Sequence, residues 1–230
     1  MAACIGGKIM GVQALDKLPY NDLSGQNRVR GGLVTAGNRT ISGRPRVLVI
    51  ASSTGGTAAL EVILNGLPAS CIPTVIVQHI RPGFTEMLAG RLDGLARMEV
   101  REAADGDILR PGLALFAPSD LHTRLRENGG ILSVECFAGE RINGVMPAAD
   151  VLFESAAVIS GEGAIGVVLT GMGADGAEGL LRMRRRGART IAQDKDSSVV
   201  YGMPKKAIEL GAAEFVLPLD RIAEKIISLI

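Results

Sequence analysis

From Val47 onward, short runs of consecutive apolar residues alternate with longer segments in which apolar residues recur every three or four positions. A continuous apolar run is typical of a parallel strand, because such a strand is covered on both faces. The runs predict strands at Val47–Ile50, Thr74–Val77, Leu113–Phe116, Ala164–Leu169, Thr190–Ala192 and Phe215–Leu217.

The segments between these runs have the spacing of helices with one apolar face. They predict helices at Ala58–Leu67, 84–95, Asp150–Ile159, Ala177–Arg186, Pro204–Leu210 and Arg221–Leu229. Two further strands, Thr123–Leu125 and Ile131–Val134, flank Asn128-Gly129-Gly130 and read as an antiparallel hairpin. The alternation predicts an α/β fold: a doubly wound, mostly parallel sheet with helices on both faces and one antiparallel hairpin.

Residues 1–45 have a different composition from the rest of the chain. They show little apolar periodicity, contain several glycines, and carry more Arg and Lys than Asp and Glu. We therefore expect a flexible or loosely docked leader at 1–45 and a folded domain at 46–230. The leader is interpreted as a solvated tail, or alternatively as a basic segment that meets an acidic partner surface.

The overall composition excludes several classes of function. The net charge of +1 creates no field that would attract nucleic acid or a membrane surface, and the absence of Trp with only 3% aromatic residues disfavours base stacking. No apolar stretch reaches the ~18–20 residues that span a bilayer, and no signal peptide is recognisable. We expect a cytoplasmic protein that binds no nucleic acid and inserts into no membrane.

The cysteines and histidines do not form a recognisable metal site. Cys4, Cys71 and Cys136 are odd in number and widely separated, and together with His79 and His122 they lack the spacing of zinc ligands. We expect reduced thiols and no bound metal.

Three polar residues of catalytic type, Ser53, His79 and Asp175, each come shortly after a predicted strand. The carboxyl ends of parallel strands meet at one edge of the sheet, where such folds bind their ligands. A serine hydroxyl needs a base nearby, which His79 would supply, and Asp175 would orient the imidazole. Backbone N–H groups of Thr54 and of the Gly171–Gly173 loop would receive the negative charge that develops on the substrate.

Each of these residues also has a purely structural interpretation. Ser53 lies on a glycine turn, His79 would cap a strand, and Asp175 would form an ordinary turn before Gly176. Other residues of the same types are alternative candidates: His122 as the base, and Asp120, Asp150 or Asp194 as the acid. A nucleotide-binding domain is disfavoured, because Gly55-Gly56 is followed by neither the Rossmann glycines nor a P-loop lysine.

From about Val47 to the C-terminus, the chain resembles the catalytic domain of the chemotaxis receptor methylesterases, the CheB family. The segments that carry the resemblance are Ser53-Thr54-Gly55-Gly56, Gln78-His79-Ile80-Arg81-Pro82-Gly83-Phe84, Ala117-Pro118-Ser119-Asp120 with His122, Asp150-Val151-Leu152-Phe153, Thr170-Gly171-Met172-Gly173-Ala174-Asp175-Gly176 and Gly202-Met203-Pro204. The resemblance implies that Ser53, rather than Ser52, is the nucleophile, with His79 as base and Asp175 as orienting acid. It also implies that the backbone N–H groups of Thr54 and Met172 are the oxyanion donors.

The resemblance further implies a reaction and its partner. The family hydrolyses γ-glutamyl methyl esters on the cytoplasmic helices of chemoreceptors, releasing methanol, and deamidates particular receptor glutamines during chemotaxis adaptation. It uses no metal and no organic cofactor. Residues 46–230 are thus expected to be a methylesterase-like catalytic domain.

Two departures from the family pattern shape the remaining expectations. Family members usually carry an N-terminal receiver domain, for which 1–45 is too short, so we expect either constitutive activity or control by a separate regulatory partner. Asn143-Gly144-Val145-Met146-Pro147 stands where the family usually has Arg and His near the active-site entrance. This change motivates an alternative function, a catalytically weakened relative that binds a receptor or signalling partner.

Overall fold

A parallel sheet forms the centre of the computed structural model, which describes residues 46–230. The predicted leader at 1–45 lies outside the described residues, so it stays a prediction. The sheet has seven strands in the order β3-β4-β2-β1-β7-β8-β9. Their bounds are β1 Val47–Ser52, β2 Thr74–Gln78, β3 Glu99–Glu102, β4 Leu113–Phe116, β7 Ala164–Val168, β8 Arg189–Gln193 and β9 Phe215–Leu217.

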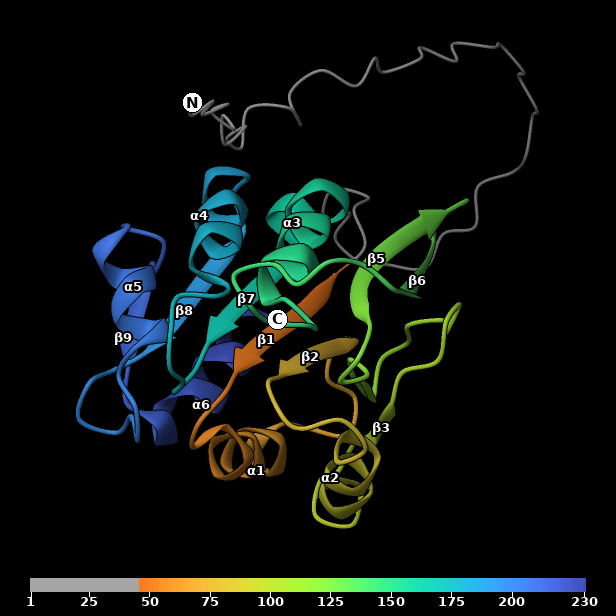
Figure 1. Cartoon of the computed structure of the whole chain (residues 1–230), viewed down its shortest axis with the longest axis horizontal. Helices are drawn as coiled ribbons and strands as arrows, with labels where there is room; N and C mark the ends of the chain where they lie inside the picture. Colours follow the sequence, from red (N-terminus) through yellow and green to blue (C-terminus); the bar gives the residue numbers. More distant parts are fainter. Residues whose placement is uncertain (1–45) are drawn as a thin grey trace, which may run out of the picture. The chain divides into compact units, whose positions relative to one another are not determined.

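Helices cover both faces of this sheet, as the sequence predicts (Figure 1). One face carries α1 Gly56–Gly66, α2 Thr85–Asp93 and α6 Leu219–Leu229, and the other carries α3 Ala149–Ile159, α4 Ala177–Arg185 and α5 Met203–Glu209. Side chains of a strand point alternately to the two faces. In β1, accordingly, Leu48 packs in the core under α1, whereas Val49 packs in the core under α3 and α4.

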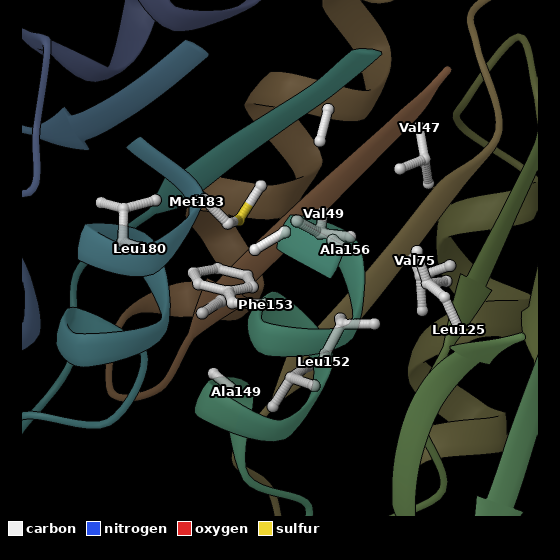
Figure 2. Close-up of a cluster of buried hydrophobic side chains, with 14 of the residues drawn as sticks. Val47, Val49, Val75, Leu125, Ala149, Leu152, Phe153, Ala156, Leu180 and Met183 are labelled. Atoms are coloured by element: carbon white, nitrogen blue, oxygen red, sulfur yellow. The ribbon is translucent and has the colours of Figure 1, made fainter. Parts of the chain in front are cut away.

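The core under α3 and α4 brings these two helices close together. Phe153 of α3 is fully buried and lies near Leu180 and Met183 of α4 (Figure 2). A Cβ atom on Gly179 of α4 would lie 2.7 Å from the Cβ atom of Phe153, which is closer than real side chains approach. The absence of a side chain at Gly179 therefore permits the close α3–α4 packing, which positions two helix N-termini at the site described below.

The antiparallel hairpin forms a separate two-stranded sheet beside α3. Its strands, β5 His122–Asn128 and β6 Ile131–Phe137, are longer than expected and pair in register from His122 with Phe137 to Asn128 with Ile131. Gly129 and Gly130 both have positive φ angles, as a tight hairpin turn requires. The hairpin prediction is confirmed.

The sequence pattern misses strand β3, and most helices start one or two residues from their predicted positions. The edge strand β3 contains a single buried apolar residue, Val100, so it shows no continuous apolar run. Helix α1 begins at Gly56 rather than Ala58. The residue before it, Gly55, has a left-handed backbone with a φ of 81° and therefore stands outside the helix. None of the helices in the described part of the chain is long and apolar enough to cross a bilayer.

Candidate active site

The structure brings Ser53, His79 and Asp175 together at the carboxyl edge of the sheet. Strand β1 lies between β2 and β7, so the residues that follow these three strands are neighbours. Backbone hydrogen bonds extend this pairing beyond the strands, from His79 N to Ser52 O (2.9 Å) and from Ser53 N to Thr170 O (3.0 Å). The predicted convergence of the three residues therefore follows directly from the strand order.

His79 and Asp175 form a largely buried pair. The Nε2 atom of His79 lies 2.8 Å from Oδ2 of Asp175, and the two side chains are 13% and 4% exposed. A carboxylate accepts hydrogen bonds, so Nε2 carries the proton and Nδ1 is left as the nitrogen that can accept one. This is the opposite ring assignment from the trypsin-like triad, in which the acid binds Nδ1.

Helix α3 fixes the carboxylate of Asp175 with its N-terminal N–H groups. The Ala149 N–H donates to Oδ2 over 2.6 Å, and the Asp150 N–H donates to Oδ1 over 3.2 Å. These groups have no partner inside the helix, and the helix dipole favours an anion at this end. Both carboxylate oxygens of Asp175 are thereby held by helix α3 as well as by the contact with His79.

The rival base, His122, is buried and occupied on both ring nitrogens. Its Nδ1 accepts the Ala148 N–H over 3.2 Å, and its Nε2 donates to the Glu140 carbonyl over 2.8 Å. A histidine with both nitrogens engaged by backbone groups is not available as a base. His122 instead fixes the residue that precedes α3, and so acts on Asp175 only through the helix.

None of the rival acids is bonded to His79. Asp194 accepts hydrogen bonds from the backbone N–H and the hydroxyl of Ser197, and Asp120 is exposed. Asp150 lies next to Asp175, but its carboxylate oxygens face Gly179 and Asn143. Of the four aspartates considered, Asp175 is therefore the one that contacts His79.

The two predicted oxyanion donors lie on loops that meet beside Ser53. Within residues 46–230, neither the Thr54 nor the Met172 backbone N–H makes a hydrogen bond. Thr170 joins the loops, because its hydroxyl donates to the Thr54 carbonyl over 2.9 Å. A Cβ atom on Gly171 would lie 2.7 Å from Ser53 Cβ, so only glycine allows this loop to approach the serine.

Ser53 itself is half-buried, and no hydrogen bond joins its hydroxyl to His79 within the described residues. In unliganded enzymes such contacts are often long and tighten only when the substrate binds. Adjacent Ser52 is fully buried and donates to Gln78 Oε1 over 2.6 Å. Position and exposure thus favour Ser53 over Ser52 as the nucleophile.

An open pocket of about 620 Å³ adjoins His79. Apart from the histidine, its lining residues are Ile80, Arg81, Phe84, Arg141, Val145 and Met146. The segment that departs from the family pattern therefore contributes apolar side chains to the pocket wall. No group of His, Cys, Asp and Glu suited to a metal ion occurs in the part of the chain that the structure describes.

Comparisons with known proteins place this chain in a family. The family model described as CheB methylesterase matches residues 48–226. The chain belongs to the CheB methylesterase family. The crystal structure of the CheB methylesterase catalytic domain of Thermotoga maritima is similar to this one, with a TM-score of 0.79 and 43% identity over 81% of this chain and 99% of that one.

Curated CheB-family relatives carry the name protein-glutamate methylesterase/protein-glutamine glutaminase. One from Anaeromyxobacter dehalogenans is 46% identical over 217 residues, which cover 94% of this chain and 60% of the relative. One from Bdellovibrio bacteriovorus is 51% identical over 178 residues, which cover 77% of this chain and 50% of the relative. The chain thus spans about half the length of the curated relatives it matches.

In this CheB-family chain, Gln78 holds the backbones of Ser53 and His79. Its Nε2 donates to Ser53 O (3.0 Å) and to His79 O (2.9 Å), while its Oε1 accepts the Ser52 hydroxyl. Gly56 must be glycine here, because a Cβ atom would lie 2.2 Å from Gln78 Oε1. In the sequence, the signal for this role is an amide side chain directly after the apolar run Thr74–Val77.

Asp150 completes a reciprocal arrangement at the N-termini of α3 and α4. Asp175, which precedes α4, binds the N-terminus of α3, and Asp150, in the first turn of α3, accepts the Gly179 N–H of α4 over 2.7 Å. Its other oxygen accepts Asn143 Nδ2 over 3.0 Å. Burial, with a contribution from the charge of Asp175, raises the pKa of Asp150 to about 6.

Replacing Gln78 with Met should destabilise the fold by about 1–3 kcal/mol, because the His79 carbonyl and the Ser52 hydroxyl lose their buried partner. Urea unfolding measures this change. Gln78→Glu keeps the acceptor for Ser52 but loses the donors, so it should lose at least as much stability. Wild-type stability in both variants would show that the amide does not hold the two backbones.

Replacing Asp150 with Asn should remove the part of the loss in folding stability at rising pH that comes from ionisation of Asp150. The raised pKa means that the folded state prefers protonated Asp150, so the stability from protonation is present below about pH 4 and lost as the pH rises through about 6. Measured by urea unfolding, wild-type stability relative to Asp150→Asn should therefore fall by roughly 2 kcal/mol between about pH 4 and 8.

The matched control is Asp220→Asn, because Asp220 is an exposed acid in the first turn of α6. The difference in free energy of unfolding between Asp220→Asn and the wild type should change much less over the same pH range. Parallel pH profiles for the wild type and Asp150→Asn would contradict the prediction.

Proposed function

We propose that this chain is a serine hydrolase that removes methyl groups from γ-glutamyl methyl esters of chemoreceptors, releasing methanol, and deamidates receptor glutamines. The observation that carries the proposal is the His79–Asp175 pair beside Ser53, with two N–H groups on the flanking loops that have no partner among residues 46–230. The names of the curated relatives support the choice of substrate. Retention of this geometry disfavours the alternative of a weakened binding module.

The proposed reaction begins at the free ring nitrogen of His79. Nδ1 accepts the proton of the Ser53 hydroxyl as its Oγ attacks the ester carbonyl, and Asp175 stabilises the imidazolium that forms. The backbone N–H groups of Thr54 and Met172 donate to the oxyanion. His79 then returns the proton to the departing methoxide, which leaves as methanol.

The second half of the reaction restores the enzyme. Water, deprotonated by His79 Nδ1, attacks the γ-glutamyl ester on Ser53, and the proton returns to Ser53 Oγ as glutamate leaves. In deamidation the same steps release ammonia instead of methanol. Neither sequence of steps requires a metal or an organic cofactor.

The proposed partner is the methylated cytoplasmic helix of a chemoreceptor, and the proposed location is the cytoplasm. The names of the relatives support a protein substrate that carries glutamyl esters. A separate regulatory partner stays a prediction of the sequence.

Ser53→Ala should lower methanol release from methylated receptor membranes by roughly 10³-fold or more, because no hydroxyl remains to form the ester intermediate. Ser52→Ala, one residue away, should lose far less activity, since its hydroxyl faces Gln78. Gas chromatography of released methanol measures both. Turnover that survives in Ser53→Ala would refute the proposed function.

A further inference from the structure

Two arginines line the pocket beside His79 without an anionic partner among residues 46–230. Arg81 lies on the loop that follows β2, and Arg141 lies on the segment between β6 and α3. Neither guanidinium group makes a hydrogen bond or an ion pair with any residue from 46 to 230, and both residues are exposed. Two segments that are distant in the sequence therefore bring unpaired positive charge to one pocket.

Most other arginines in the described range have a carboxylate or carbonyl partner. The paired ones are Arg46, Arg91, Arg101, Arg110, Arg124, Arg126, Arg182, Arg184, Arg189 and Arg221. Three other arginines have no partner among the described residues, and each is exposed and follows or ends a helix. They are Arg97, Arg185 and Arg186. Arg81 and Arg141 differ from these because they share a cavity that adjoins the catalytic base.

The walls of the pocket strengthen an interaction with an anion. Ile80, Phe84, Val145 and Met146 supply apolar surface, and no acidic side chain is among the described residues that line it. Charges attract one another more strongly beside apolar surface than in open water. The pocket is thus electrostatically complementary to a negatively charged group.

We propose that Arg81 and Arg141 form an anion subsite that binds a carboxylate of the protein substrate close to the glutamyl group being cleaved. Guanidinium groups bind carboxylates through paired N–H donors, which fixes orientation as well as charge. The inference rests on the proposed function, because it assigns the pocket to the substrate of Ser53. Its consequence is a preference for esters that are flanked by Asp or Glu.

Binding tests the subsite without catalysis. Two fluorescent peptides carry the same glutamyl methyl ester, flanked by Glu in one and by Gln in the other, and their affinities for the Ser53→Ala protein are measured by anisotropy. The acidic peptide should bind about tenfold more tightly, which corresponds to 1.4 kcal/mol. Raising the salt from about 20 mM to about 500 mM should remove most of this preference, because the charges are screened.

Variants identify the residues responsible. Arg81→Gln and Arg141→Gln should each reduce the preference about threefold, and the double variant should abolish it. Arg185→Gln is the matched control, because Arg185 is exposed and unpaired among the described residues but lies at the end of α4. Arg141→Glu should instead favour a peptide flanked by Lys. Equal affinities for the two original peptides, or none measurable for either, would overturn the subsite.

Turnover separates this inference from the proposed function. Methanol release from both peptides is measured with intact Ser53. Acidic preference in binding without methanol from either peptide would refute the function and support the subsite. Equal kcat/KM and equal affinity for the two peptides, with methanol released from both, would support the function and overturn the subsite.

Discussion

The carboxylate of Asp175 connects the His79 side chain to the scaffold, and the geometry of the candidate site depends on this connection. One of its oxygens receives both the His79 Nε2–H and the Ala149 N–H, and the other receives the Asp150 N–H. The N-terminus of α3 thus orients the Asp175 carboxylate, and the carboxylate orients the imidazole of His79. A shift of α3 would be transmitted to His79 through this one side chain.

The reciprocal contacts of α3 and α4 explain why this arrangement is rigid. Helix α3 supplies N–H groups to Asp175, which lies two residues before α4, and α4 supplies the Gly179 N–H to Asp150 of α3. Burial raises the pKa of Asp150 to about 6, and repulsion from the nearby Asp175 carboxylate contributes to the rise. The N–H groups of two helix ends offset the repulsion, and Gly179 allows the close approach that makes the contacts possible.

The sequence predicts the fold and the convergence of the site because both follow from local pattern. Apolar runs identify the buried strands, and the shared carboxyl edge of parallel strands brings Ser53, His79 and Asp175 together. The roles of Gln78, Asp150 and His122 in positioning were not predictable, because each depends on a contact between elements distant in the sequence. Strand β3 was missed for a similar reason, since pairing with β4 rather than an apolar run defines it.

The central claim is that Asp175 fixes the proton of His79 on Nε2 and leaves Nδ1 as the base. Proton–nitrogen correlation NMR of the two histidine rings tests this claim directly. His122 serves as an internal reference, because it also donates from Nε2. The account predicts an Nε2-bound proton on both rings, with the His79 signal lost to exchange in Asp175→Ala and the His122 signal retained. A proton on Nδ1 of His79 in the wild-type protein would contradict the account.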